Sequence, residues 1–251
     1  MVKKIAYLLI GLSAIGLAFT LKQKKSAAQG FAVIELFTSE GCSSCPPADA
    51  LIAKIENENK ERPVYILAYH VDYWNRLGWK DSFSSALNSK RQNQYADWLR
   101  LNSVYTPQIV VNGIREFIGS EEKTLRNALQ NSLAETGQNH LEIAVEKHTG
   151  SAISLNYQTG RQVQGDNLVV AIVNPGATNK IERGENKGRI LNHVQIVSSF
   201  ETFSLNGKEK GLVSLTSGSI KNDFELIAFL QNVKSGQIKA ATKLALKAQS
   251  E

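Results

Sequence analysis

Short apolar runs and helical repeats alternate in the first half of the chain. Apolar runs of strand length occupy residues 31–37, 63–71 and 104–111. Hydrophobic positions recur at helical spacing from Pro46 onward and over residues 82–101. Asn112-Gly113 predicts a hairpin turn into a strand at 114–118, and Ser120 can cap a last helix. The predicted order is strand–helix–strand–helix–strand–strand–helix, which is typical of an α/β thioredoxin-like domain.

The pattern changes after about residue 137. Seven short apolar runs separated by turns follow, at residues 141–145, 153–157, 168–173, 194–205, 211–216, 224–231 and 237–246. The turns include Asn174-Pro-Gly176 and Asn206-Gly207. Many short strands with turns between them favour an all-β, sandwich-like domain. We therefore expect a thioredoxin-like domain at 29–137 and a β-sandwich-like domain at 138–251.

Composition and charge exclude two broad classes of protein. The 251 residues are 42% hydrophobic and 21% charged, which is ordinary for a globular protein and argues against disorder. Residues 1–28 contain five lysines and no acid, so removing them lowers the formal net charge from +6 to +1. A nearly neutral body gives no electrostatic reason to bind nucleic acid.

Residues 1–28 resemble an export segment. Two lysines precede the apolar run 5–21, and small residues at 26–28 offer a cleavage site. Lys22, Lys24 and Lys25 lie between them, so cleavage near Ala18, or retention of 5–21 as a membrane tether, stays open. We expect a periplasmic or secreted protein, with a signal peptide or an N-terminal anchor.

Cys42 and Cys45 form a Cys-x-x-Cys pair at a predicted helix start. There the unpaired N–H groups and the helix dipole favour the thiolate of Cys42, the species that attacks in disulfide exchange. Cys45, one turn further in, suits the resolving role. An inert bridge is an alternative, although closing so short a loop stabilises little. A second alternative is that the two cysteines form half of a metal site that histidines complete.

Thr106-Pro107 precedes the apolar residues of a strand. Proline cannot donate to a sheet ladder, so it must lie at the strand's entry. A cis bond there would turn the preceding backbone towards the cysteines. The alternative is an ordinary trans turn.

The segment that leaves the second strand is rich in aromatic residues, among them Trp74 and Trp79. His70 and Asp72 lie two apart on extended backbone and face the same way. As a hydrogen-bonded pair near the dithiol they would assist proton transfer. Alternatively, the aromatics form a small core and His70 is a buried structural residue.

Several long strings resemble a secreted, thioredoxin-like bacterial family of unknown function. They are Glu35–Asp49 (ELFTSEGCSSCPPAD), His70–Trp74 (HVDYW), Leu77–Trp79, Arg91-Gln92, Tyr95-Ala96, Val104–Gln108 (VYTPQ), Arg183–Asn186 (RGEN) and Leu191–His193. The resemblance covers nearly everything after the leader. It implies export and a thioredoxin fold, with Cys42, Cys45, Thr106 and Pro107 as the redox apparatus.

The same resemblance affects the charged loop at 182–189. From composition alone that loop is a solvated connection. As part of the family pattern, Arg183, Glu185, Asn186 and His193 become candidate functional residues. The chain has Glu40 where the family string has glutamine, and a carboxylate two residues before Cys42 opposes thiolate formation.

The sequence therefore predicts a thiol–disulfide oxidoreductase that acts on protein thiols or disulfides of the cell envelope. Its only redox group would be the Cys42–Cys45 disulfide, without a separate cofactor. One alternative is a Cu(I) or zinc protein that uses Cys42, Cys45 and His70 or His193, because thiolates select these metals. Another is an envelope interaction protein with a structural disulfide.

Overall fold

The computed structural model describes residues 30–135, 140–149, 151–160, 163–217 and 222–247. The predicted leader at 1–28 and the predicted domain boundary at 137/138 lie outside these ranges. The elements are β1 (Ala32–Thr38), α1 (Pro46–Glu58), β2 (Val64–His70), η1 (Asn75–Leu77), α2 (Ala86–Leu99), β3 (Gln108–Val111), β4 (Arg115–Ile118), α3 (Glu122–Ala134), β5 (Leu141–His148), β6 (Ala152–Thr159), β7 (Asp166–Lys180), β8 (Ile190–Ser204), β9 (Lys210–Thr216), β10 (Phe224–Asn232) and β11 (Ile238–Leu246). No helix in these ranges is long and apolar enough to cross a membrane.

The element order predicted for both halves of the chain is confirmed, but some boundaries differ. The second helix begins at Ala86 rather than residue 82, because Ser85 caps it by accepting a hydrogen bond from the Leu87 N–H. Leu87, one of the hydrophobic positions of the predicted helix, is exposed. Ser120 does not cap the last helix, whose N-cap is Glu121.

The predicted turn at Asn174-Pro-Gly176 is wrong: these residues lie inside β7. Asn174 pairs with Ile196 and Gly176 with Val194, whereas Pro175 between them has no partner in the ladder. The missing N–H of this proline therefore removes no ladder bond from the sheet. As a result β7 and β8 continue as one long hairpin.

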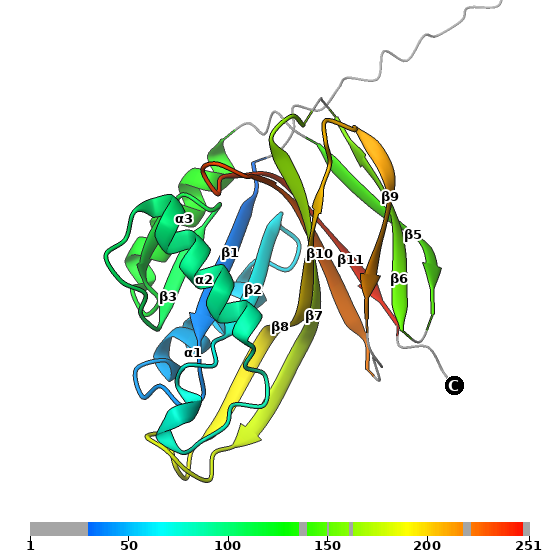
Figure 1. Ribbon diagram of the computed structural model, residues 1–251. Helices are drawn as coiled ribbons and strands as arrows, with labels where there is room; N and C mark the ends of the chain where they lie inside the picture. The colour runs from blue at the N-terminus through cyan, green and yellow to red at the C-terminus, as the bar shows by residue number, and fades with distance from the viewer. Residues whose placement is uncertain (1–29, 136–139, 150, 161–162, 218–221, 248–251) are drawn as a thin grey trace, which may run out of the picture.

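The fold is mixed α/β, with one large mixed sheet and one small antiparallel sheet (Figure 1). The large sheet has the strand order β11-β10-β7-β8-β2-β1-β3-β4, and β5-β6-β9 form the small one. Strands β1 and β2 are parallel, and β2 meets β8 through the parallel pair Ala68 and Ile196. The large sheet thus contains strands from both sides of the predicted domain boundary, and the division into two domains stays a prediction.

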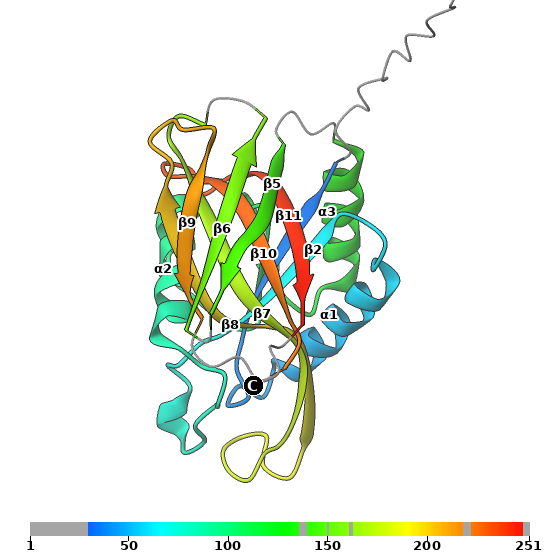
Figure 2. The ribbon, with the colours of Figure 1, turned by 90° about the vertical axis from the view of Figure 1, so that its right-hand side faces the viewer.

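Helices cover both faces of the part of the large sheet that comes from the first half of the chain (Figure 2). Ile34 and Leu36 of β1 pack with Ile52 of α1 and Leu125 of α3 on one face. Alternate residues of β1 point the other way, towards the α2 face, where a second core also includes residues of β7 and β10. A third core fills the space between the small sheet and strands β7, β10 and β11 of the large sheet.

A buried ionic network joins α2 to the sheet. Arg91, which interrupts the apolar stripe of the helix, donates from Nε to Glu35 Oε1 at 2.5 Å and from Nη2 to Gln231 Oε1 at 3.3 Å. The Tyr95 hydroxyl donates to the other oxygen of Glu35. Because Glu35 is on β1 and Gln231 on β10, Arg91 links elements from the two halves of the chain.

Candidate functional site

The two cysteines form a disulfide at the start of α1. β1 leads into the loop that carries Cys42, and Cys45 is the N-cap of α1. Pro46 and Pro47 occupy the first helical positions, where a missing N–H costs nothing. The sulfurs therefore lie at the electropositive end of the helix, as predicted.

Thr106 and Pro107 face this disulfide through a cis peptide bond, which confirms the predicted isomer. The Thr106 carbonyl oxygen lies 3.9 Å from the Sγ of Cys42, and its hydroxyl donates to that sulfur at 3.3 Å. Trp74 holds the hydroxyl in place by donating from Nε1 at 2.8 Å. The geometry thus sets a backbone carbonyl and a hydroxyl against the sulfur expected to react.

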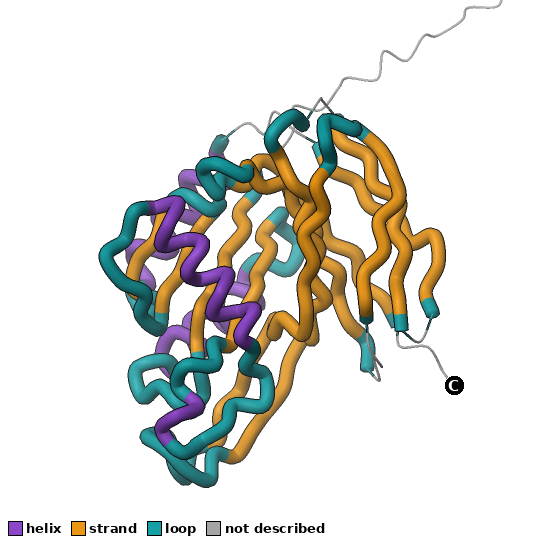
Figure 3. Tube along the Cα trace, viewed as in Figure 1, coloured by secondary structure: helices purple, strands orange, loops and turns teal. Residues whose placement is uncertain are grey.

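Both cysteines are fully buried, and the tip of the β7–β8 hairpin lies against the loop that carries Cys42. The loop 181–189, which we name the cover loop, reaches across from the second half of the chain. Glu185 accepts a hydrogen bond from the Ser43 N–H at 3.1 Å. Asn186 donates from Nδ2 to the carbonyl oxygens of Glu40 and Cys42, at 2.8 and 2.9 Å. Figure 3 shows loops gathered at this end of the sheet.

A buried histidine lies between two carboxylates beside the disulfide. Nε2 of His193 is 3.4 Å from Glu40, and its Nδ1 is 3.9 Å from Asp49. Burial alone would lower the pKa of His193, but the nearby carboxylates of Asp49 and Glu40 outweigh burial and raise the pKa to about 9. One cation therefore compensates part of the negative charge near the sulfurs.

Glu40 is turned away from solvent and tightly held. Trp79 donates from Nε1 to its Oε2 at 2.7 Å, and Asn179 donates to its Oε1 at 2.8 Å. These donors, together with His193, stabilise a carboxylate that the sequence suggested would act directly against the Cys42 thiolate.

The predicted pairing of His70 with Asp72 is wrong. His70 Nδ1 bonds instead to Asp81 Oδ2 at 2.7 Å, in a fully buried pair. Asp72 accepts from Ser89 on α2 at 2.5 Å. After His70 the chain leaves β2 and folds back at Asp81, so the two-residue alternation of a strand no longer applies. Burial raises the pKa of Asp81, but the stronger combined effect of His70 and backbone donors leaves it below its ordinary value.

The structure brings most of the candidate residues together. Cys42, Cys45, Thr106, Pro107 and Trp74 form the disulfide face. Trp79, Glu185, Asn186 and His193 lie around or beneath it, whereas Arg183 lies exposed in the cover loop. His70 lies at the edge of this group. Its ring centroid is 4.8 Å from that of His193, and its partner Asp81 also accepts a hydrogen bond from the Glu40 N–H at 2.9 Å.

Asp49, Asp81 and Asn179 also belong to the site, although the sequence did not indicate them. Asp49 follows Cys45 by one helical turn, so helical spacing could have indicated it. Asp81 and Asn179 have no comparable local signal. Their positions depend on the loop after β2 and on the register of the long β7–β8 hairpin.

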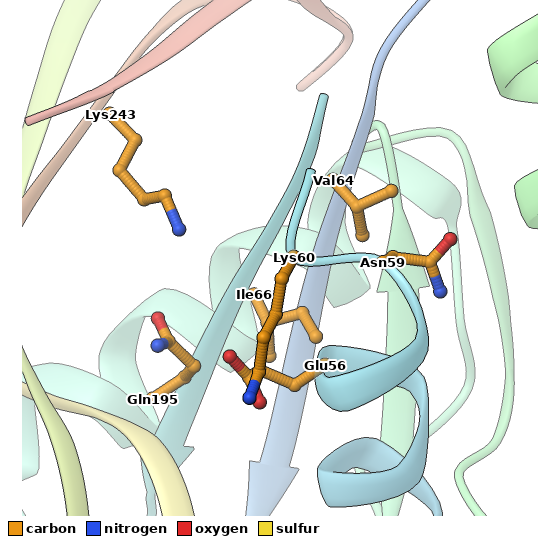
Figure 4. Close-up of a pocket in the computed structure, with 7 residues that line it drawn as sticks. All are labelled: Glu56, Asn59, Lys60, Val64, Ile66, Gln195 and Lys243. Atoms are coloured by element: carbon orange, nitrogen blue, oxygen red, sulfur yellow. The ribbon is translucent and has the colours of Figure 1, made fainter. Parts of the chain in front are cut away.

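Within the described ranges, no group of three or more Cys, His, Asp or Glu residues has an arrangement that could hold a metal ion. A pocket lies elsewhere, at the far end of α1, lined by residues that include Lys60, Gln195 and Lys243 (Figure 4). Since α1 has 13 residues, about 20 Å of helix separates that end from the cysteines. The pocket is therefore not part of the disulfide site.

Fold and site together define a mixed α/β protein whose Cys-x-x-Cys disulfide faces a cis proline. The chain belongs to the DUF1223 family, described as a protein of unknown function, whose pattern matches residues 33–231. This confirms the resemblance to an uncharacterised family. No curated protein matches the chain.

A solved structure with similarity over nearly the whole chain is that of protein AGR_C_4864 from Agrobacterium tumefaciens. It is 29% identical, with a TM-score of 0.67, over 90% of this chain and 99% of the other. A domain of the outer membrane lipoprotein Omp28 from Porphyromonas gingivalis matches 46% of this chain and 93% of its own, at 11% identity and a TM-score of 0.27. That score is too low to support an argument.

Proposed function

We propose that this protein is an exported thiol–disulfide oxidoreductase with a thioredoxin-like core, acting on protein thiols or disulfides of the cell envelope. One observation carries the proposal: the Cys42–Cys45 disulfide lies at a helix N-terminus, with the Thr106 carbonyl beside the Cys42 sulfur. The helix end favours Cys42 as a thiolate, hence as a leaving or attacking group. The apolar, lysine-flanked leader supports export, and an oxidising compartment maintains such a disulfide.

The reaction is an exchange with a partner that carries two thiols. A partner thiolate attacks the Cys42 sulfur, the bond between Cys42 and Cys45 breaks, and Cys45 leaves as a thiolate. The second partner thiolate then attacks the partner's sulfur in this mixed disulfide and releases Cys42. The partner loses two electrons and forms a disulfide, while the two cysteines gain the electrons and take up the two protons.

Buried charge around the sulfurs fits this chemistry. Reduction places negative charge on Cys42 or Cys45, close to the carboxylates of Glu40 and Asp49. His193 lies between those carboxylates and offsets them. Its positive charge makes the reduced state less costly than the two acids alone would allow.

The test uses the full-length protein and two matched variants. Cys45→Ser keeps the attacking sulfur but cannot resolve, so it should accumulate mixed disulfides with envelope proteins, while Cys42→Ser should accumulate far fewer. The intact protein should also accelerate insulin reduction by dithiothreitol and equilibrate with glutathione buffers. Insulin reduction at the uncatalysed rate, with no adducts and no exchange with glutathione, would rule the proposal out.

One observation favours a second function, that of an envelope interaction protein with a structural disulfide. Both cysteines are fully buried in the oxidised protein. Under this alternative the disulfide fixes the loop that receives the cover loop, and no exchange follows. The glutathione measurement separates the two functions, because a purely structural bridge stays oxidised across the buffers that reduce an exchanging one.

A further inference from the structure

The disulfide is enclosed although the loop that carries it reaches the surface. Ser43 and Ser44, between the cysteines, are exposed, whereas Cys42 and Cys45 are not. The cover loop bonds to the backbone beside this surface, at the free end of the two 15-residue strands β7 and β8 (Figure 1). It is thus a protruding element laid on the site.

The cover loop attaches through backbone groups of the cysteine loop. The Ser43 N–H donates to Glu185, and the carbonyl oxygens of Glu40 and Cys42 accept from Asn186. One acceptor and one donor, supplied by two neighbouring side chains, thus satisfy three main-chain groups around Cys42. An extended polypeptide offers the same pair of functions in its own C=O and N–H groups.

The loop also keeps its shape by itself. Ile181 and Arg189 close its base with a backbone hydrogen bond, and Lys187 donates to the carbonyl of Gly184 within it. Gly184 has φ of +75°, and a Cβ there would lie 3.2 Å from that of Trp79. A loop with its own internal bonds can move as a unit at the end of a hairpin without unfolding the sheet.

Asn186 is only half satisfied in this position. Its side chain is 1% exposed, and its Oδ1 has no hydrogen-bond partner within the described residues. Leaving a buried acceptor unpaired disfavours the covered state, whereas exposure to water would satisfy it. The structure therefore contains both the contacts that close the cover and a reason for it to open.

We infer that the cover loop occupies the docking groove of the disulfide, and that an extended polypeptide bearing the reacting thiol displaces Glu185 and Asn186 to reach Cys42. The inference deepens the proposed function and rests on it for the identity of the partner. It assigns the partner as a protein segment rather than a small thiol, because a backbone replaces all three contacts.

The first test measures how fast the phosphine TCEP reduces the disulfide in the full-length protein. The phosphine supplies the two electrons and ends as the phosphine oxide, with its oxygen taken from water. Glu185→Ala combined with Asn186→Ala should raise the rate about tenfold, as the loss of two or three modest hydrogen bonds allows. Glu182→Gln, an exposed acid in the same loop, and Asn192→Ala on the same hairpin should leave it unchanged.

The single variant Glu185→Gln keeps the shape of an exposed side chain, so it guards against misfolding of the double variant. It should raise the rate by a smaller factor at an unchanged thermal midpoint. Equal TCEP rates in the wild type and in both cover variants, with native unfolding curves, would overturn the inference.

A second arm separates the cover from the proposed function. The probes are reduced, unfolded ribonuclease A, as an extended protein thiol, and glutathione. The wild type should oxidise ribonuclease thiols much faster than it oxidises glutathione. The double variant should oxidise glutathione faster than the wild type does, so the ratio of the two oxidation rates should fall. If TCEP rates change but no ribonuclease thiol is oxidised, the cover stands and the oxidoreductase fails. If ribonuclease thiols are oxidised but the cover variants change neither the TCEP rate nor the rate of glutathione oxidation, the oxidoreductase stands and the cover inference fails.

Discussion

At the scale of single residues, His193 carries the charge balance beneath the disulfide. It is buried between Glu40 and Asp49, two carboxylates that approach it from the cysteine loop and from α1. A buried carboxylate without a compensating charge is strongly destabilising. His193 should therefore contribute to folding as well as to the potential of the cysteines.

We expect stability to depend on pH through His193. Its pKa is raised from 6.5 to about 9 in the folded protein. The stabilisation is thus complete below pH 6.5 and is lost as the pH rises through 9. A shift of this size corresponds to about 3 kcal/mol. Denaturant unfolding of the wild type, compared below pH 6.5 and above pH 9, measures this loss.

Two variants identify the residue responsible. Below pH 6.5, His193→Gln should be less stable than the wild type. Its free energy of unfolding should change little between that pH and pH 9. His140→Gln replaces an exposed histidine that pairs with Glu142 and should retain the wild-type dependence. Parallel pH curves for the wild type and His193→Gln would show that His193 is not the titrating group.

Local sequence signals located the sulfurs and the cis proline, but not the partners of His70 and Glu40. A Cys-x-x-Cys pair before two prolines is recognisable because helix starts have local rules. The bond from His70 to Asp81 crosses an irregular loop, and His193 is remote from Glu40 in the chain. Contacts of this kind depend on the finished fold, so the strand alternation that suggested a His70–Asp72 pair gave the wrong partner.

At the scale of elements, hydrophobic periodicity predicted the order of helices and strands because each element buries a face of fixed period. It misplaced β7, where a proline and a glycine read as a turn. The strand tolerates Pro175 because the residues on either side of it are paired and Pro175 itself is not. Because a turn was predicted there, the sequence did not indicate how long the β7–β8 hairpin is, nor that its tip lies against the cysteine loop.

The link between α2 and the sheet gives a prediction at this scale. Arg91→Ala leaves the Glu35 carboxylate buried without its cation, and we expect a loss of about 3–5 kcal/mol in the free energy of unfolding. Arg126→Ala removes an exposed arginine that also pairs with two carboxylates, Glu58 and Glu122, and should reduce stability much less, because solvent screens exposed ion pairs. Urea unfolding measures both.

A third variant tests the cause. Adding Glu35→Gln to Arg91→Ala removes the unpaired charge and should restore part of the lost stability. If Arg91→Ala and Arg126→Ala cost the same, the buried network does not hold α2 in place.

At the scale of the whole molecule, the pairing of the strands could not be predicted from the sequence. The apolar runs predicted the strands of the second half, but not that four of them would extend the first sheet while three would form another. An apolar run specifies a buried strand and not its neighbour. The parallel contact of Ala68 with Ile196 brings together residues far apart in the chain.

The core on the α2 face joins both halves. Val33 and Leu67 of the first sheet strands pack in the same cluster as Val169 and Phe229. The Arg91 network crosses between the same halves. Separating them would expose buried apolar surface and an ionic network at once, which opposes independent unfolding.

We therefore expect the full-length protein to unfold in one cooperative transition. The chain's three tryptophans, Trp74, Trp79 and Trp98, all lie in the first half, and Trp98 also donates to the Val233 carbonyl of the second half. Their fluorescence therefore reports on the first half and on its contacts with the second. Far-ultraviolet circular dichroism reports on strands of both halves. The two signals should give the same midpoint and slope in guanidinium chloride. A fluorescence transition clearly separated from the dichroism transition would establish two independently stable domains, and the shared core would then be only a contact surface between them.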